Sequence, residues 1–78
     1  MPRFFFHVYN DETCLDDEGQ ELADVEAARA TAIKEARVLI GESVRNGHIV
    51  LSHHIAIARQ SGELVGDISF GEAVAIRP

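Results

Sequence analysis

The sequence predicts an α+β domain in which one long amphipathic helix packs on one face of a small sheet. Three observations carry this prediction: an aromatic first strand, a long stretch with helical periodicity, and a β-branched region divided by a turn. The order strand, acidic loop, helix, strand, strand gives a sheet of three strands, or of four. A chain of 78 residues has room for one core, so residues 1–78 form a single domain.

The first strand spans Arg3 to Tyr9, which is rich in aromatic and β-branched residues and ends at a polar run. Successive side chains of a strand point to opposite faces of the sheet. One face therefore carries Phe4, Phe6 and Val8, and the other carries Phe5, His7 and Tyr9.

The helix begins after Asp24, a good N-cap, and Glu26 places negative charge in its first turn. It ends at Asn46 and Gly47, where glycine tolerates the left-handed conformation of a C-terminal cap. At 100° per residue its apolar arc contains Val25, Ala28, Ala32, Ile33, Ala36, Leu39, Ile40 and Val44.

The last two strands form a hairpin, since Ser61 and Gly62 make a plausible two-residue turn. That turn pairs Gln60 with Glu63 and sets which residues share a face. The side facing the helix carries Ile55, Ile57, Leu64, Ile68 and Phe70, and the other side carries His54, Ala56, Ala58, Val65, Asp67 and Ser69. Residues 71–78 form either a helical turn at Glu72 to Ala75 or an extended tail.

One helix covers only one face of the sheet, so the opposite face needs another partner. This second face is more apolar than a solvated sheet, and such patches mark interfaces. We therefore expect a homo-oligomer, most simply a two-fold dimer, formed through this face or through an edge strand. The alternative is that the acidic loop and the tail fold back over the face. The expected interface residues are Phe5, Tyr9, Ala56, Ala58 and Val65.

Charge and hydropathy exclude two classes of partner. Seven basic against thirteen acidic residues give a net charge of −6, which argues against nucleic acid. No apolar stretch is long enough to span a membrane. Since Cys14 is the single cysteine, no internal disulfide forms, and we expect a cytoplasmic protein. Eight acids lie in one stretch without Lys or Arg: Asp11, Glu12, Asp16, Asp17, Glu18, Glu21, Asp24 and Glu26.

Four histidines raise the question of a metal site, because imidazole is a common metal ligand. His53 and His54 are adjacent in a strand and point to opposite faces, so they cannot act together. The best candidate trio is His7, His54 and Asp67 on the uncovered face, which could bind zinc or relay protons. We expect no other cofactor.

The acidic loop does not match a calcium-binding EF-hand. Aligning Gly19 with the obligatory glycine at position six puts Val25 at position twelve, where the bidentate glutamate belongs. Cys14 has carboxylates and no basic residue near it in sequence, which disfavours a reactive thiolate. Neither feature indicates catalysis.

The chain resembles an uncharacterised family of small alphaproteobacterial domains of unknown function that begin Met-Pro-Arg, an aromatic residue and Phe. The opening Met-Pro-Arg-Phe-Phe-Phe-His-Val carries the resemblance, and so does the segment Asp17-Glu18-Gly19-Gln20-Glu21-Leu22. Further likeness lies in the Ala-rich helix from Glu26 to Ala36, in Ile55 to Ile57, in Gly62 and in Phe70 to Val74. The resemblance implies a stand-alone cytoplasmic bacterial domain and no catalytic residue.

Two functions follow from these observations. The first is a non-enzymatic, homo-oligomeric interaction module. The alternative is a small metal- or ligand-binding protein, or an enzyme, that uses the His, Asp and Tyr side chains of the uncovered face.

Overall fold

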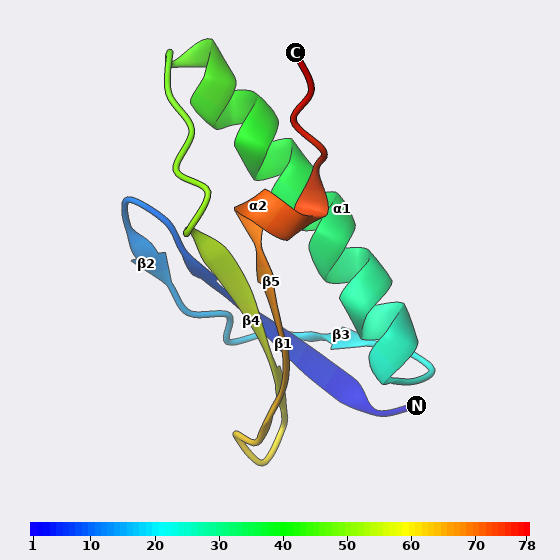
Figure 1. The fold of residues 1–78 in the computed structure, drawn as a ribbon. Helices are drawn as coiled ribbons and strands as arrows, with labels where there is room; N and C mark the ends of the chain where they lie inside the picture. The colour runs from blue at the N-terminus through cyan, green and yellow to red at the C-terminus, as the bar shows by residue number, and fades with distance from the viewer.

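A computed structural model of residues 1–78 shows one long helix packed against an antiparallel sheet (Figure 1). The α+β class predicted from the sequence is confirmed. The elements are β1 (Arg3–Tyr9), β2 (Thr13–Cys14), β3 (Gln20–Glu21), α1 (Val25–Arg45), β4 (His54–Arg59), β5 (Leu64–Ser69) and α2 (Phe70–Ala73).

The sheet has the strand order β2-β1-β4-β5, and β3 pairs with the same strand as β2, namely β1. The central pair is β1 with β4, in register from Phe4 opposite Arg59 to Tyr9 opposite His54. Five strands form rather than three or four, because the acidic loop adds two short strands along the free edge of β1. These additions satisfy backbone groups that would otherwise be exposed at that edge.

The core lies between α1 and the inner face of the sheet. Four helix residues spaced by one turn are buried, and three of them are alanines, which let the helix approach the strands closely. Val44 was expected on this face but is 57% exposed, because the last turns of α1 extend beyond the sheet (Figure 1). The core cluster contains Phe4, Phe6, Ala28, Ala32, Ala36, Ile40, Ile55, Ile57, Ile68, Phe70 and Ala73.

Both predicted ends of α1 are confirmed. The Asp24 carboxylate accepts a hydrogen bond from the Ala27 N–H at 2.8 Å, which satisfies one of the free N–H groups of the first turn. At the other end Gly47 has a φ of +88°, and its N–H donates to the Val44 carbonyl.

The hairpin turn differs from the prediction. The Arg59 N–H donates to the Glu63 carbonyl at 2.8 Å, so the loop has three residues, Gln60 to Gly62, rather than two. Gly62 has a φ of +94°, as the last residue of such a loop requires.

A β-bulge on β5, where Val65 is the extra residue opposite the step from Ile57 to Ala58, then restores the predicted register for the rest of the hairpin. The longer turn and the bulge together exchange the faces of two neighbouring residues. Leu64 pairs with Ala58 and is 67% exposed, although we expected it in the core. Val65, which we placed in the interface, packs against the core instead.

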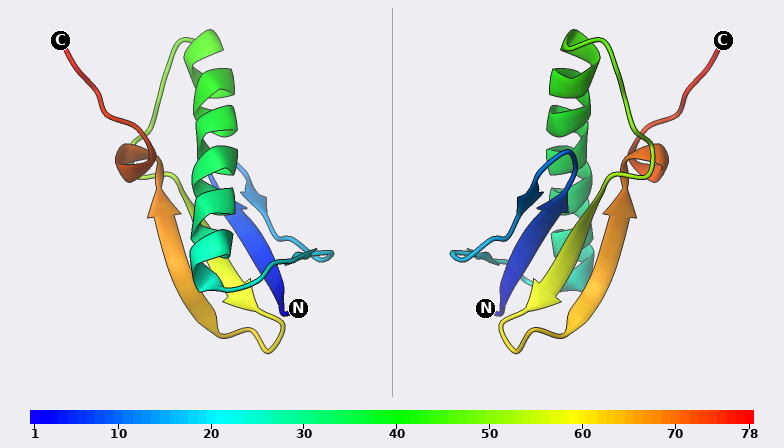
Figure 2. Two further views of the ribbon diagram at one scale, coloured as in Figure 1. Left: turned by 90° about the vertical axis from the view of Figure 1, so that its right-hand side faces the viewer. Right: turned by 90° about the vertical axis from the view of Figure 1, so that its left-hand side faces the viewer.

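The C-terminal segment contains both of the expected alternatives. The helical turn α2 begins two residues earlier than predicted, and a capping box between Ser69 and Glu72 closes its start. The ring of Phe70 is fully buried. From Val74 the chain is an extended tail that runs away from the sheet (Figure 2).

Candidate interaction face

The face of the sheet turned away from α1 is called the outer face below. In the right-hand view of Figure 2, β1, β4 and β5 lie in front of α1, and no helix crosses them. The register β1 to β4 places Phe5 opposite Ala58 and Tyr9 opposite His54 on this face. Partners across an antiparallel pair share a face, so the Phe5 ring lies beside Ala58 and the Tyr9 ring lies beside His54.

The outer face is a mixture of half-buried rings and buried small residues. Ala56 and Ala58 are only 6% and 3% exposed, whereas Phe5 and Tyr9 are half-buried. The exposed side chain of Leu64 extends the apolar surface onto β5. The four predicted residues other than Val65 therefore lie together on the outer face.

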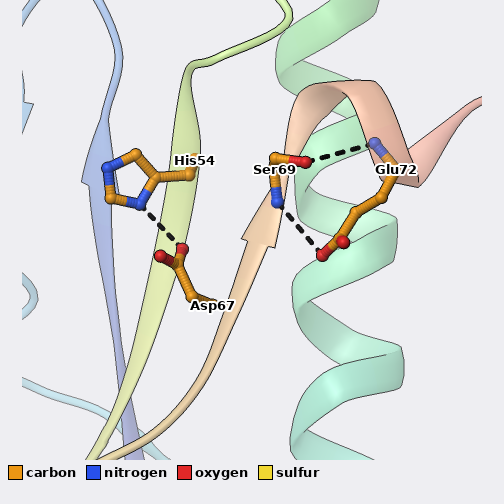
Figure 3. Close-up of polar contacts among 4 residues, drawn as sticks. All are labelled: His54, Asp67, Ser69 and Glu72. Carbon is orange, nitrogen blue, oxygen red and sulfur yellow. Dashed lines mark hydrogen bonds and ion pairs between the residues drawn. The ribbon is translucent and has the colours of Figure 1, made fainter.

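A polar group lies beside this apolar surface. The His54 Nδ1 is 2.7 Å from the Asp67 carboxylate (Figure 3). The Tyr9 ring stacks on the imidazole, with ring centroids 5.0 Å apart. The carboxylate favours a hydrogen on Nδ1, which fixes the orientation of the ring. Ser69 lies opposite His54, but its hydroxyl accepts the Glu72 N–H and caps α2 (Figure 3). A histidine oriented in this way resembles a general base, yet no hydroxyl or thiol is hydrogen-bonded to it.

The predicted metal trio does not come together. His7 lies on the outer face, but its Nδ1 accepts a hydrogen bond from the Asp16 N–H at 3.0 Å. His54 and Asp67 pair with each other instead. No group of three or more His, Cys, Asp or Glu side chains has the arrangement of a metal site.

The other two histidines flank one carboxylate. The Asp11 oxygens lie 3.4 Å from His48 Nε2 and 3.8 Å from His53 Nε2. The His53 ring also meets the edge of the Phe70 ring, with centroids 5.7 Å apart. These contacts join the turn after β1 to the loop before β4, and they confirm that His53 and His54 point to opposite faces.

Asp16 organises the acidic loop, a role that sequence reasoning missed. One carboxylate oxygen accepts the N–H groups of Glu18 and Gly19, and the other accepts the N–H of Phe6 in β1. Burial alone would raise the pKa of Asp16, but the N–H groups of Gly19, Phe6 and Glu18 lower it below its ordinary value. The carboxylate thus occupies the gap between β2 and β3 on the edge of β1. The signal in the sequence is an Asp followed three residues later by Gly, which is typical of an Asx turn.

The family model described as a domain of unknown function, DUF6894, matches residues 3–71. The chain belongs to this family. The match covers every strand, α1 and the start of α2, so the outer face lies wholly inside the DUF6894 domain. No curated protein and no solved structure matches the chain. None of its helices combines the length and the apolar character needed to cross a membrane.

Proposed function

We propose that the chain is a non-enzymatic interaction module that forms a two-fold homodimer through the outer face. The observation that carries this proposal is the set of half-buried aromatic rings, Phe5 and Tyr9, on a sheet face that no other element covers (Figure 2). The tail runs away from this face, and the acidic loop meets it only along β1, where the Asp16 N–H donates to His7 and Gly19 lies beside the Phe5 ring. Apolar sheet faces of this kind are typical of interfaces.

The size of the exposed surface favours association with a second copy, whichever face is used. A compact monomer of 8.6 kDa exposes roughly 4,700 Å². This chain exposes 5158 Å², and only 13 of its 78 residues are buried. A small core leaves little net stability, and a second copy on the outer face would add to it.

The side chains of the face that remain accessible can meet in a two-fold arrangement. On β1, Phe5 lies opposite Ala58 and His7 lies opposite Ala56, and both alanines are buried within the chain. When two identical faces meet about a two-fold axis, the exposed parts of Phe5, Tyr9 and Leu64 of one copy contact the same side chains of the other. The His54–Asp67 pair then lies at the rim, where its charge remains solvated.

Sedimentation velocity between 1 and 500 µM tests this proposal. We expect a concentration-dependent dimer for the native chain and a monomer for Tyr9→Asp and for Leu64→Asp. Leu64 is mostly exposed, so its replacement leaves the fold intact, as circular dichroism would verify. The matched control is Val38→Asp, at a position on α1 that is 59% exposed. A native chain that stays monomeric at 500 µM, or a control that dissociates equally, contradicts the proposal.

The paired His54 and Asp67 beside Tyr9 favour a second function, the binding of a small ligand on the same face. A stacked aromatic pair with one oriented imidazole could hold a planar molecule. Mass spectrometry of the purified native protein separates the two functions. A stoichiometric small molecule or metal ion that His54→Ala releases, while dimerisation persists, would favour this second function.

A further inference from the structure

A pocket of about 290 Å³ opens on the other side of the sheet, between β1, the acidic loop and α1. Its apolar walls are the side chains of Phe6, Val8 and Leu15. Thr31 and Glu35, one turn apart on α1, close it from the helix side. The pocket does not touch the outer face, because Phe6 and Val8 point toward α1.

The pocket exists because the core is not closed at this edge. Thr31 and Glu35 stand where larger apolar side chains would seal the contact between α1 and β1. Leu15, at the rim, is 68% exposed and Val8 is only half-buried. Apolar side chains left in this state gain free energy when another apolar group covers them.

The charge of the pocket is of one sign. Asp16 and Glu35 are its only charged lining residues, and both are acidic. Glu35 makes no ion pair or side-chain hydrogen bond within the chain, so its carboxylate is free to bind a cation. The neighbouring carboxylates of Asp17 and Glu18 add to the negative potential, which attracts basic partners.

The edge of the sheet beside the pocket is also open. Strand β2 ends the strand order on this side, so its outer edge has no partner strand. Cys14 in β2 lines the pocket as well. An extended segment lying along β2 would therefore place a side chain at the mouth of the pocket.

We propose that this pocket binds an arginine side chain carried by an extended segment of a partner protein. The aliphatic stem lies against Phe6, Val8 and Leu15, and the guanidinium pairs with the Glu35 carboxylate. Arginine fits better than lysine, because its planar guanidinium pairs with a carboxylate through two parallel hydrogen bonds. This site is independent of the outer-face dimer, and each can fail without the other.

Titration of the ¹⁵N-labelled chain with the peptide acetyl-Ala-Leu-Arg-Leu-Ala-amide tests the proposal. We expect shifts of the amide signals of Val8, Cys14 and Thr31. Replacing the arginine of the peptide by glutamine weakens binding about tenfold, as loss of one charge-assisted contact would. Glu35→Gln in the protein weakens it by about the same factor. Glu42→Gln is the matched control, since it removes one exposed charge from the same helix and leaves binding unchanged.

Three results would overturn the proposal. The first is equal weakening by Glu35→Gln and Glu42→Gln, which indicates unspecific charge attraction. The second is binding that survives Thr31→Leu, a change that fills the pocket, in a variant whose spectrum shows the native fold. The third is binding of agmatine, a free guanidinium compound, as tight as that of the peptide, which would make this a site for small molecules. None of these readouts depends on the oligomeric state.

Discussion

The most specific structural prediction concerns Asp16, whose carboxylate accepts three backbone N–H groups at 3.0 to 3.1 Å. In Asp16→Asn the amide nitrogen cannot accept, so at least one donor loses its partner. Removing a hydrogen bond to a charged group costs about 1.5–3 kcal/mol, and solvent screening reduces this at a partly exposed site. We expect a loss of about 1–2 kcal/mol in the free energy of unfolding, or roughly 5–15 °C in Tm.

Urea unfolding followed by circular dichroism, at one fixed protein concentration, measures this loss. Asp17→Asn is the matched control, because it removes the same charge from an exposed neighbour that makes no side-chain hydrogen bond or ion pair. Hydrogen exchange should also quicken at the amides of Phe6 and Gly19. Equal losses for the two variants would refute the assignment of Asp16 as the organiser of the loop.

The pH dependence of the same variant follows from the lowered pKa of Asp16. Because the pKa in the folded state lies below the ordinary value of 3.8, the ionised carboxylate stabilises the folded chain fully above that value. The contribution is lost as the pH falls through the lower, folded-state pKa. The difference in the free energy of unfolding between the native chain and Asp16→Asn should therefore be constant near neutral pH and shrink below about pH 4. A difference that does not change with pH would contradict this reasoning.

Two further predictions concern the positive φ of Gly19 and the cap of α2. Gly19→Ala should cost about 1–3 kcal/mol, because Gly19 has a φ of +72° and a Cβ there would lie 2.8 Å from the Phe4 carbonyl oxygen. Gly62→Ala is the comparison, because Gly62 also has a positive φ but no atom lies within 4 Å of a Cβ placed there. A loss of stability in Gly62→Ala as large as that in Gly19→Ala would contradict the steric argument. Ser69→Ala should cost about 1 kcal/mol by removing the cap of α2, and Ser69→Asp should restore most of it. Thermal unfolding measures both sets, and a neutral Ser69→Ala would show that the capping box does not stabilise α2.

Much of the fold could be predicted because local signals agreed with each other. Asp24 and Gly47 mark the ends of α1 by their capping chemistry, and both act as expected. Alternation in β1 assigned Phe4 and Phe6 to the core correctly. These signals depend only on neighbours in sequence, so a single chain is enough to read them.

The predictions were wrong where one additional residue in a turn changes the face on which the following side chains lie. A turn of three residues instead of two, followed by a bulge, exchanges the faces of Leu64 and Val65. The Ser69 and Glu72 pattern of a capping box was a readable signal for the start of α2. It places the helical turn two residues earlier than the one expected.

The candidate site was harder to predict because it depends on contacts between distant residues. The outer-face residues of β1 and β4 could be assigned by alternation, whereas the partner of His7 could not. Its Nδ1 is occupied by the N–H of Asp16, nine residues away in the loop. The pocket beside Glu35 could not be predicted from the sequence either, because it depends on the path of the acidic loop along β1.

The proposed function depends on contact between the outer faces of two copies. An isotope-filtered nuclear Overhauser experiment on a mixture of labelled and unlabelled chains detects such a contact. The proposed dimer gives intermolecular cross-peaks between the methyl groups of Leu64, which is 67% exposed, and the rings of Phe5 and Tyr9. Cross-peaks confined to α1, or none at a concentration where sedimentation shows a dimer, would contradict it.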